Sequence, residues 1–189
     1  MAGKLDDLDL EIIRQLQKDG RISVTELAKK VKSTRPTVTN KLKRLIDEKL
    51  IVFRTGVNSK EFGLKMASVG LEVKNEATRK ELEESLKNCP RVLVLFRKPR
   101  KANIHAIVWG ENYQAMNSTM ESIRDLENVD IIYTHYLGTP IHGNIIVNSI
   151  SGNNDEAPCG MKCADCYRYE KAWCFGCPAS KYYKNPLLK

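Results

Sequence analysis

Five of the chain's six cysteines lie within the last 31 residues, at a spacing that suits metal binding. The segment reads C-x3-C-x2-C-x7-C-x2-C and a proline follows it directly. A C-x2-C pair in a tight turn directs two sulfurs to one point, and a structural Zn2+ or an iron–sulfur cluster commonly takes four thiolates. Residues 159–189 are too few to bury a core of their own. We therefore predict a metal-binding module whose ligands are Cys159, Cys163, Cys166, Cys174 and Cys177.

The spacing leaves three kinds of centre open. A tetrathiolate Zn2+ site built from the last four cysteines explains both C-x2-C pairs and leaves Cys159 spare. A [4Fe-4S] cluster explains the C-x3-C-x2-C tripod and the C-x2-C-P ending. A thiol–disulfide switch would use the paired thiols without a metal. We favour zinc slightly over the cluster, and both of them over the switch.

Two neighbouring features set the context of this module. Residues 151–158 are polar and contain glycine and proline, so we predict a flexible linker that lets the module move. The sixth cysteine, Cys89, stands alone before a proline and is expected to be a packed small side chain.

The composition indicates a soluble protein of one to three small domains. The chain has 189 residues, of which 42% are hydrophobic and 29% are charged. It has no apolar run near eighteen residues and no signal-peptide pattern at the N-terminus. Clustered cysteines in such a chain indicate metal or redox chemistry, because cytosolic thiols stay reduced. We expect a cytoplasmic protein without a membrane partner.

The positive charge is concentrated near the N-terminus. Residues 1–60 contain 14 Lys and Arg against 8 Asp and Glu, whereas residues 61–150 contain 11 of each kind. A basic block beside a neutral one indicates a polyanionic partner for the first block, most commonly nucleic acid.

Three short helices are predicted in this basic block. Apolar residues at helical spacing follow a possible cap at Asp6 and stop before Asp19-Gly20. Ser23 and Glu26 predict a capping box at the start of a second helix that ends near residues 30–32. A third helix begins near Pro36, and its predicted buried residues are Val38, Leu42, Leu45 and Ile46. The last two helices have the layout of a helix-turn-helix.

The outward arc of the third helix would meet DNA. Asn40 is suited to bond adenine and Arg44 guanine, whereas shorter or more mobile polar side chains suit phosphates. Residues 50–55 read as a strand that would form a wing and carry one further arginine to the phosphate backbone. The predicted DNA-binding residues are Arg35, Thr37, Asn40, Lys41, Lys43, Arg44 and Arg54.

Residues 4–57 resemble the N-terminal domain of the Lrp/AsnC family of prokaryotic transcription regulators. The motifs that carry the resemblance are Leu5-Asp6-x-x-Asp9-x-x-Ile12, Asp19-Gly20-Arg21-x-Ser23, Glu26-Leu27-Ala28 and Val38-x-x-x-Leu42-x-x-Leu45. The resemblance implies double-stranded DNA as partner and, in our interpretation, an archaeal source. The chain departs from the family in the turn at residues 31–34, which lacks the usual glycine.

The middle of the chain supports the same resemblance. Apolar periodicity predicts strands at residues 67–73, 91–96, 104–109 and 131–136, with helices at 77–86 and 113–126. This βαββαβ order is ferredoxin-like and resembles the second half of Lrp/AsnC proteins, which implies a homodimer or higher oligomer and a palindromic operator. The family often carries Gly and Asp near a bound amino acid. Here that stretch is residues 101–103, Lys-Ala-Asn, so a small-molecule effector is left open.

The predicted architecture is thus α+β in four segments. These are a winged helix-turn-helix at residues 1–60, a ferredoxin-like dimerisation domain at 61–150, the linker at 151–158 and the cysteine-rich module at 159–189. We predict a non-enzymatic regulator, since the sequence lacks paired carboxylates, a phosphate-binding glycine loop and a nucleophile beside a base. The alternatives are a redox or metal-handling protein and a non-specific architectural DNA binder.

Overall fold

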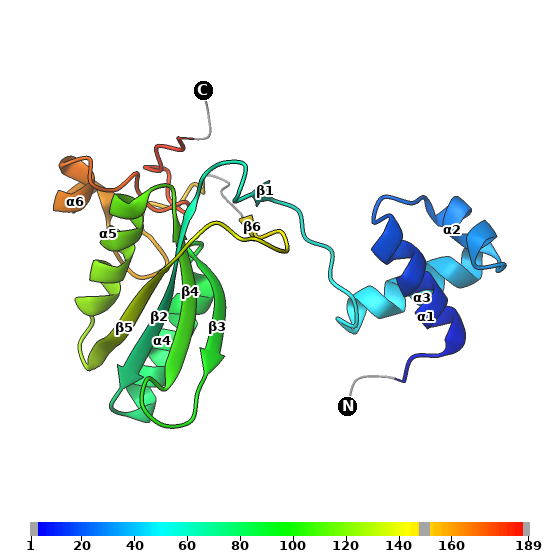
Figure 1. Ribbon diagram of the computed structural model, residues 1–189, viewed down its shortest axis with the longest axis horizontal. Coiled ribbons are helices and arrows are strands. Elements are labelled where there is room, and N and C mark those ends of the chain that lie inside the picture. Colours follow the sequence, from blue (N-terminus) through cyan, green and yellow to red (C-terminus); the bar gives the residue numbers. More distant parts are fainter. Residues whose placement is uncertain (1–3, 148–151, 187–189) are drawn as a thin grey trace. The chain divides into compact units, whose positions relative to one another are not determined.

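Two compact units make up the protein, Met1–Arg54 and Thr55–Lys189 (Figure 1). The computed structural model describes residues 4–147 and 152–186. The first unit is helical, and the second combines helices with an antiparallel sheet, so the α+β prediction is confirmed. Within the described ranges, no helix has the length and apolarity needed to cross a membrane.

All three predicted helices are present in the first unit. They are α1 (Asp7–Lys18), α2 (Val24–Lys30) and α3 (Arg35–Asp47). Asp6 caps α1 in a reciprocal capping box with Asp9. At the start of α2 Ser23 accepts from the N–H of Glu26 without a return bond in the described part of the chain, and the Glu26 carboxylate lies 3.5 Å from Lys30 Nζ. The helices enclose a core of Ile12, Leu27, Ala28, Val38 and Leu45. Ile46, predicted to be buried, is 43% exposed.

The turn between α2 and α3 is formed without a glycine. Lys32 adopts the left-handed conformation, with φ of 52°. The N–H of Ser33 donates to the carbonyl of Ala28 at 3.0 Å, which is the closure that a glycine usually permits at a helix end. The turn therefore exists as predicted, although its residue type departs from the family pattern.

The prediction of a wing at residues 50–55 is wrong. Lys49, with φ of 57°, ends α3 and turns the chain back, so the N–H groups of Leu50 and Ile51 both donate to the carbonyl of Leu45. These two side chains pack on the helical core, while Phe53 is 51% exposed. A short apolar run is compatible with a strand or with a segment that packs against helices, and here residues 50 and 51 pack against the helical core.

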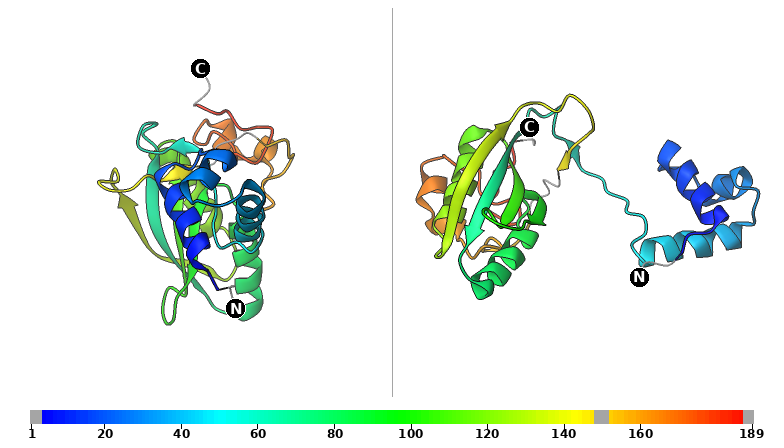
Figure 2. Two further views of the ribbon diagram at one scale, coloured as in Figure 1. Left: turned by 90° about the vertical axis from the view of Figure 1, so that its right-hand side faces the viewer. Right: turned by 60° about the horizontal axis from the view of Figure 1, so that its bottom comes forward.

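The second unit has the predicted βαββαβ order. Its elements are β2 (Lys65–Val73), α4 (Glu76–Asn88), β3 (Val92–Arg97), β4 (Ile104–Gly110), α5 (Tyr113–Arg124) and β5 (Val129–Leu137). The strands pair antiparallel in the order β3-β4-β2-β5. Both helices cover one face of the sheet, because alternate residues of β2 and β4 share a core with Leu82 and Leu86 of α4 and with Met116 and Met120 of α5 (Figures 1 and 2). A small additional ladder joins β1 (Val57–Asn58) to β6 (Ile146–Val147), and the sequence did not predict it.

The C-terminal segment packs against this unit. It contains a short 3-10 turn η1 (Cys163–Asp165) and one helical turn α6 (Tyr167–Glu170), which lies beside α5 (Figures 1 and 2). Residues 152–158 are anchored to it: the N–H of Gly152 donates to Pro178 O at 2.7 Å and that of Lys181 to Asn154 O at 3.0 Å. The described part of the predicted linker, residues 152–158, is therefore bonded to the cysteine-rich segment itself, and Ser151 lies outside the described residues.

Candidate functional site

The outward face of α3 presents polar side chains that are free to meet a ligand. Arg35, Thr37, Asn40 and Lys43 are exposed, and Thr37 Oγ1 lies 2.8 Å from the capping hydroxyl of Thr34. Within the described part of the chain, the side chains of the other three have no hydrogen-bond or ion-pair partner. Arg54, also predicted to touch DNA, is exposed after α3. Four of the seven predicted residues are thus exposed on α3.

Two other residues predicted to contact DNA, Lys41 and Arg44, bond to α1 instead. Asp9 is fully buried, and its carboxylate accepts hydrogen bonds from Lys41 Nζ at 3.1 Å and from the Arg44 guanidinium. Lys41 also pairs with Asp6. The cations of Lys41 and Arg44 therefore fix α3 to α1, and this contact competes with the guanine contact predicted for Arg44. The sequence reasoning missed Asp9, although its place in the first motif could have flagged it.

The pKa of Asp9 shows how strongly this network favours the ionised carboxylate. Burial alone would raise the pKa, but the N–H of Asp6 and the two cations outweigh it and lower the pKa to about 2. Because the unfolded value is about 3.9, the network stabilises the folded unit above pH ~4, and this contribution is lost as the pH falls through about 2.

Replacing Asp9 by Asn should therefore destabilise the first unit by about 2 kcal/mol at pH 7, since Lys41 and Arg44 keep some access to water. The difference from wild type should shrink as the pH approaches 2. Hydrogen exchange of the α1 and α3 amides would measure it. Asp7→Asn, an exposed change in the same helical turn, should cost less than about 1 kcal/mol. Equal effects of the two substitutions at pH 7 would contradict this role for Asp9.

All six cysteines of the chain line one pocket of the second unit. The pocket has a volume of about 80 Å³ and is also lined by Arg91 and Arg168. All six side chains are free thiols. The five predicted ligands thus line one pocket, and Cys89, predicted to be a packed small side chain, lines the same pocket. Cys89 reaches the pocket from the turn between α4 and β3, and no local sequence pattern predicts this position.

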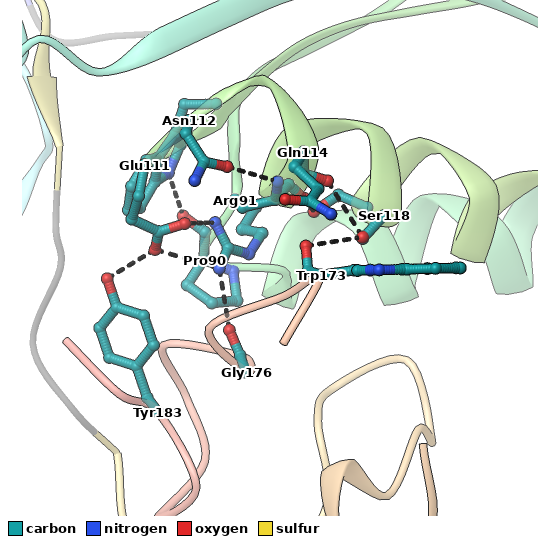
Figure 3. Close-up of polar contacts among 12 residues, drawn as sticks. Pro90, Arg91, Glu111, Asn112, Gln114, Ser118, Trp173, Gly176 and Tyr183 are labelled. Carbon is teal, nitrogen blue, oxygen red and sulfur yellow. Dashed lines mark hydrogen bonds and ion pairs between the residues drawn. The ribbon is translucent and has the colours of Figure 1, made fainter. Parts of the chain in front are cut away.

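Arg91, which lines this pocket, belongs to a buried ion pair (Figure 3). Arg91 bonds the Glu111 carboxylate twice, at 2.8 and 3.1 Å, and the two side chains are only 4% and 3% exposed. Arg91 also donates to the carbonyl of Gly176 at 2.8 Å, and the Tyr183 hydroxyl donates to Glu111 at 2.6 Å. The pair therefore joins the sheet to the cysteine-rich segment at two points, one within its last C-x2-C turn and one after it.

A second arginine attaches the helical part of the same segment. Arg168 of α6 is 5% exposed and pairs with Glu121 at 3.1 Å and Asp125 at 2.6 Å, both at the end of α5. Nearby, the Ser118 hydroxyl donates to the carbonyl of Trp173 at 3.2 Å (Figure 3). These contacts hold the segment on α5, so the thiols have fixed positions relative to the sheet.

The pocket stabilises neutral thiols unless a cation enters it. Burial raises the pKa of Cys174 and raises that of Cys177 to about 12, although the N–H groups of Gly176 and Ala179 donate to the two sulfurs and oppose the shift. A bound metal would supply the missing positive charge and displace the protons.

The donor set fits a thiophilic group, but its spacing does not fit one ion. Within residues 4–147 and 152–186, no three Cys, His, Asp or Glu side chains are grouped closely enough to hold a single metal ion. Four thiolates that share one Zn2+ at ~2.3 Å would lie within about 4 Å of each other. Thiols that surround a space instead suit a centre with several metal atoms, each bound by its own thiolate.

Known proteins match both units of this chain. An AsnC-type helix-turn-helix domain matches residues 5–46. An uncharacterized HTH-type transcriptional regulator of Pyrococcus abyssi is 31% identical over 136 residues, which cover 66% of this chain and 84% of the relative. The regulator LrpC of Bacillus subtilis is 30% identical over 95 residues, which cover 50% of this chain and 66% of LrpC.

Solved structures agree at the level of the fold. The structure of Bacillus subtilis LrpC has a TM-score of 0.59 at 26% identity and covers 74% of this chain and 99% of LrpC. The leucine response regulatory protein LrpA of Mycobacterium tuberculosis has a TM-score of 0.66 at 19% identity and covers 74% of this chain and 96% of LrpA. With its AsnC-type helix-turn-helix and its βαββαβ unit, the chain belongs to the Lrp/AsnC family of transcription regulators, which are not enzymes.

Proposed function

We propose that this regulator binds DNA sequence-specifically by placing α3 in the major groove. The observation that carries the proposal is the exposure of Arg35, Asn40 and Lys43 on α3, whose side chains have no partner in the described part of the chain. Asn40 would read a base edge, while Arg35, Thr37 and Lys43 would contact phosphates. Lys41 and Arg44 would act by holding α3 on α1 through Asp9.

Selection of duplexes from a random DNA pool tests this proposal. The affinity for the selected duplex and for a scrambled duplex would be measured at one salt concentration, since salt changes both. We expect the selected duplex to bind at least about 1,000-fold more tightly. A ratio near one would instead support the non-specific architectural DNA binder.

We propose further that the protein acts as a homodimer on a roughly palindromic operator. The sheet face opposite α4 and α5 carries Phe96, which is 53% exposed, and Val94, which is 41% exposed. A row of aromatic rings continues across this face from Phe96 through His105 and Tyr133 to His135. A second copy packed on this face would bury the row, and two copies would present two α3 helices to two half-sites.

A charge on this face should prevent the association, because an unpaired buried carboxylate is costly. Phe96→Glu is therefore expected to give a monomer where the wild type is a dimer, as measured by light scattering at matched concentration. Phe62→Glu changes an aromatic side chain that is 48% exposed outside the sheet and should leave the mass unchanged. A dimeric Phe96→Glu variant would place the interface elsewhere.

For the C-terminal segment we propose a thiolate-bound metal centre whose four ligands come from the pocket thiols, and the candidates in the tail are Cys159, Cys163, Cys166, Cys174 and Cys177. We favour a [4Fe-4S] cluster over the Zn2+ site, because the C-x3-C-x2-C tripod and the C-x2-C-P ending suit a cluster and the thiols surround a pocket. Such a group would supply a charge that depends on its oxidation state. Arg91, Glu111 and Arg168 join the segment to β3, β4 and α5, so the state of the pocket would reach the sheet that pairs two copies. Six free thiols support a reducing location, the cytoplasm.

Purification without oxygen, followed by iron, zinc and sulfide analysis with an absorption spectrum, tests the metal centre. We expect iron and sulfide in similar amounts. Zinc without sulfide would mean that the thiols converge on one ion when it binds. Neither metal, before or after reconstitution, would contradict a metal centre and leave the thiol–disulfide switch as the function of the pocket.

A further inference from the structure

Cys89 lies in a turn whose backbone is held by several hydrogen bonds. It follows the last residue of α4, and its carbonyl accepts from the N–H of Val92 at 3.0 Å. The indole of the buried Trp109 donates to the carbonyl of Pro90 at 2.8 Å, and Arg91 reaches the carbonyl of Gly176 (Figure 3). The Cys89 thiol is therefore presented to the pocket by a rigid backbone.

The same pattern of N–H donors surrounds Cys89 and the cysteines of the last C-x2-C turn. Burial raises the pKa of the Cys89 thiol, and the N–H of Arg91, which donates to its sulfur, opposes the shift. Likewise the N–H of Gly176 donates to the sulfur of Cys174, and that of Ala179 to the sulfur of Cys177. In all three cases the donor stands two residues after the cysteine. Such donors favour the thiolate form, which is the form that binds metals.

Cys89 lines the same pocket as the tail thiols, among them Cys159 and Cys177. The bond from Arg91 to Gly176 ties the Cys89 turn directly to the C-x2-C loop between Cys174 and Cys177. The loop is equally constrained, because Gly176 has φ of +89° and an added Cβ there would lie 2.8 Å from Tyr182 O.

We propose that Cys89 is a ligand of the metal centre, so that the centre bridges the tail and the turn between α4 and β3. This inference rests on the thiolate centre proposed above. Each ligand thiol, Cys89 included, releases its proton to solvent as it binds. The bound group then crosslinks the last segment of the chain to the domain that carries the sheet, and its loss frees the two parts from each other at this point.

The test compares Cys89→Ser with Thr119→Val in the full chain. Both residues line the pocket and both substitutions preserve side-chain size, but only the first removes a thiol. Each protein would be reconstituted anaerobically with Fe2+ and sulfide in one arm and with Zn2+ alone in the other. Metal affinity would be measured by chelator competition, and the number of sulfur ligands per metal by X-ray absorption.

We expect Cys89→Ser to lose metal affinity by more than about 100-fold, beyond the ~10–100-fold that changes outside the ligand shell cause. We also expect it to lose one thiolate from the ligand count, while Thr119→Val keeps the count and loses less than about tenfold. A Cys89→Ser protein that loads with unchanged affinity and sulfur count would overturn the inference while leaving the centre in place. A wild-type protein that takes up neither metal would instead overturn the thiolate centre itself.

If Cys89→Ser fails to fold, the role of Cys89 as a ligand is tested on the wild type. Alkylation by iodoacetamide before and after chelation, with each cysteine followed by mass spectrometry, should show Cys89 gaining reactivity together with Cys159 and Cys177. Metal release that exposes the tail thiols and leaves the reactivity of Cys89 unchanged would overturn the inference.

Discussion

Replacing Glu111 by Gln is expected to destabilise the second unit by about 3–5 kcal/mol, the cost of leaving a buried charge without its partner. Arg91 is 4% exposed and would stay charged, with only the Gly176 carbonyl and the face of Trp109 beside it. The Tyr183 hydroxyl would lose its charged acceptor at the same time. Because these partners connect the sheet to the tail, docking of the tail should weaken together with the unit's stability.

Tryptophan fluorescence during urea unfolding would measure this effect. The chain has two tryptophans, Trp109 and Trp173, and both belong to the second unit, so the signal reports on that unit alone. Glu121→Gln is the matched control: its carboxylate pairs with Arg168 but is 46% exposed, so the loss should be at most about 1 kcal/mol. Similar losses for the two variants would show that the Arg91–Glu111 pair contributes no more than a surface ion pair.

Replacing Asn40 by Ala is expected to cost about 1–3 kcal/mol of operator affinity, confined to one base position. Asn40 is the exposed amide in the middle of α3, and an amide pairs with adenine through two hydrogen bonds. Lys43→Ala should instead weaken all duplexes alike and reduce the salt dependence of binding by about one phosphate contact. Titrations of duplexes substituted at single positions, at two salt concentrations, would separate the two effects.

Arg44→Ala provides the contrast within the same helix. Its guanidinium bonds Asp9, so we expect a loss of stability in the first unit and no loss of discrimination at a single base pair. If Arg44→Ala relaxed the preference at one guanine, then Arg44 would leave Asp9 when DNA binds, as the sequence alone suggested.

Periodicity was sufficient to predict the elements that repeat a pattern several times. The observed strand Lys65–Val73 contains the predicted 67–73, and the helix Tyr113–Arg124 ends two residues before the predicted end. The β1–β6 ladder could not be predicted, because two residues per strand are too few to show alternation. The prediction of a strand at residues 50–55 is wrong for a different reason, because the left-handed backbone at Lys49 sets the direction of the chain there.

The candidate sites were predictable only where their residues are neighbours in sequence. The spacing of the five tail cysteines identifies them as candidate ligands, and the exposed residues of α3 follow from the helical repeat. Cys89 and Asp9 are different, because each gains its role from a tertiary contact: one meets the tail thiols across the fold, and the other meets Lys41 and Arg44 of a separate helix. Hydrophobic pattern and local propensity contain no information about such pairings.

The measurement that tests the central claim most directly compares one operator duplex bound by the metal-loaded and the chelator-treated protein. Metal content would be measured in both samples, and both titrations would use the same salt concentration. If the thiol pocket regulates DNA binding through the second unit, the two affinities should differ by about 5–150-fold, the range of typical coupling between sites. Equal affinities, with the metal shown to be gone, would contradict a regulatory role for the pocket.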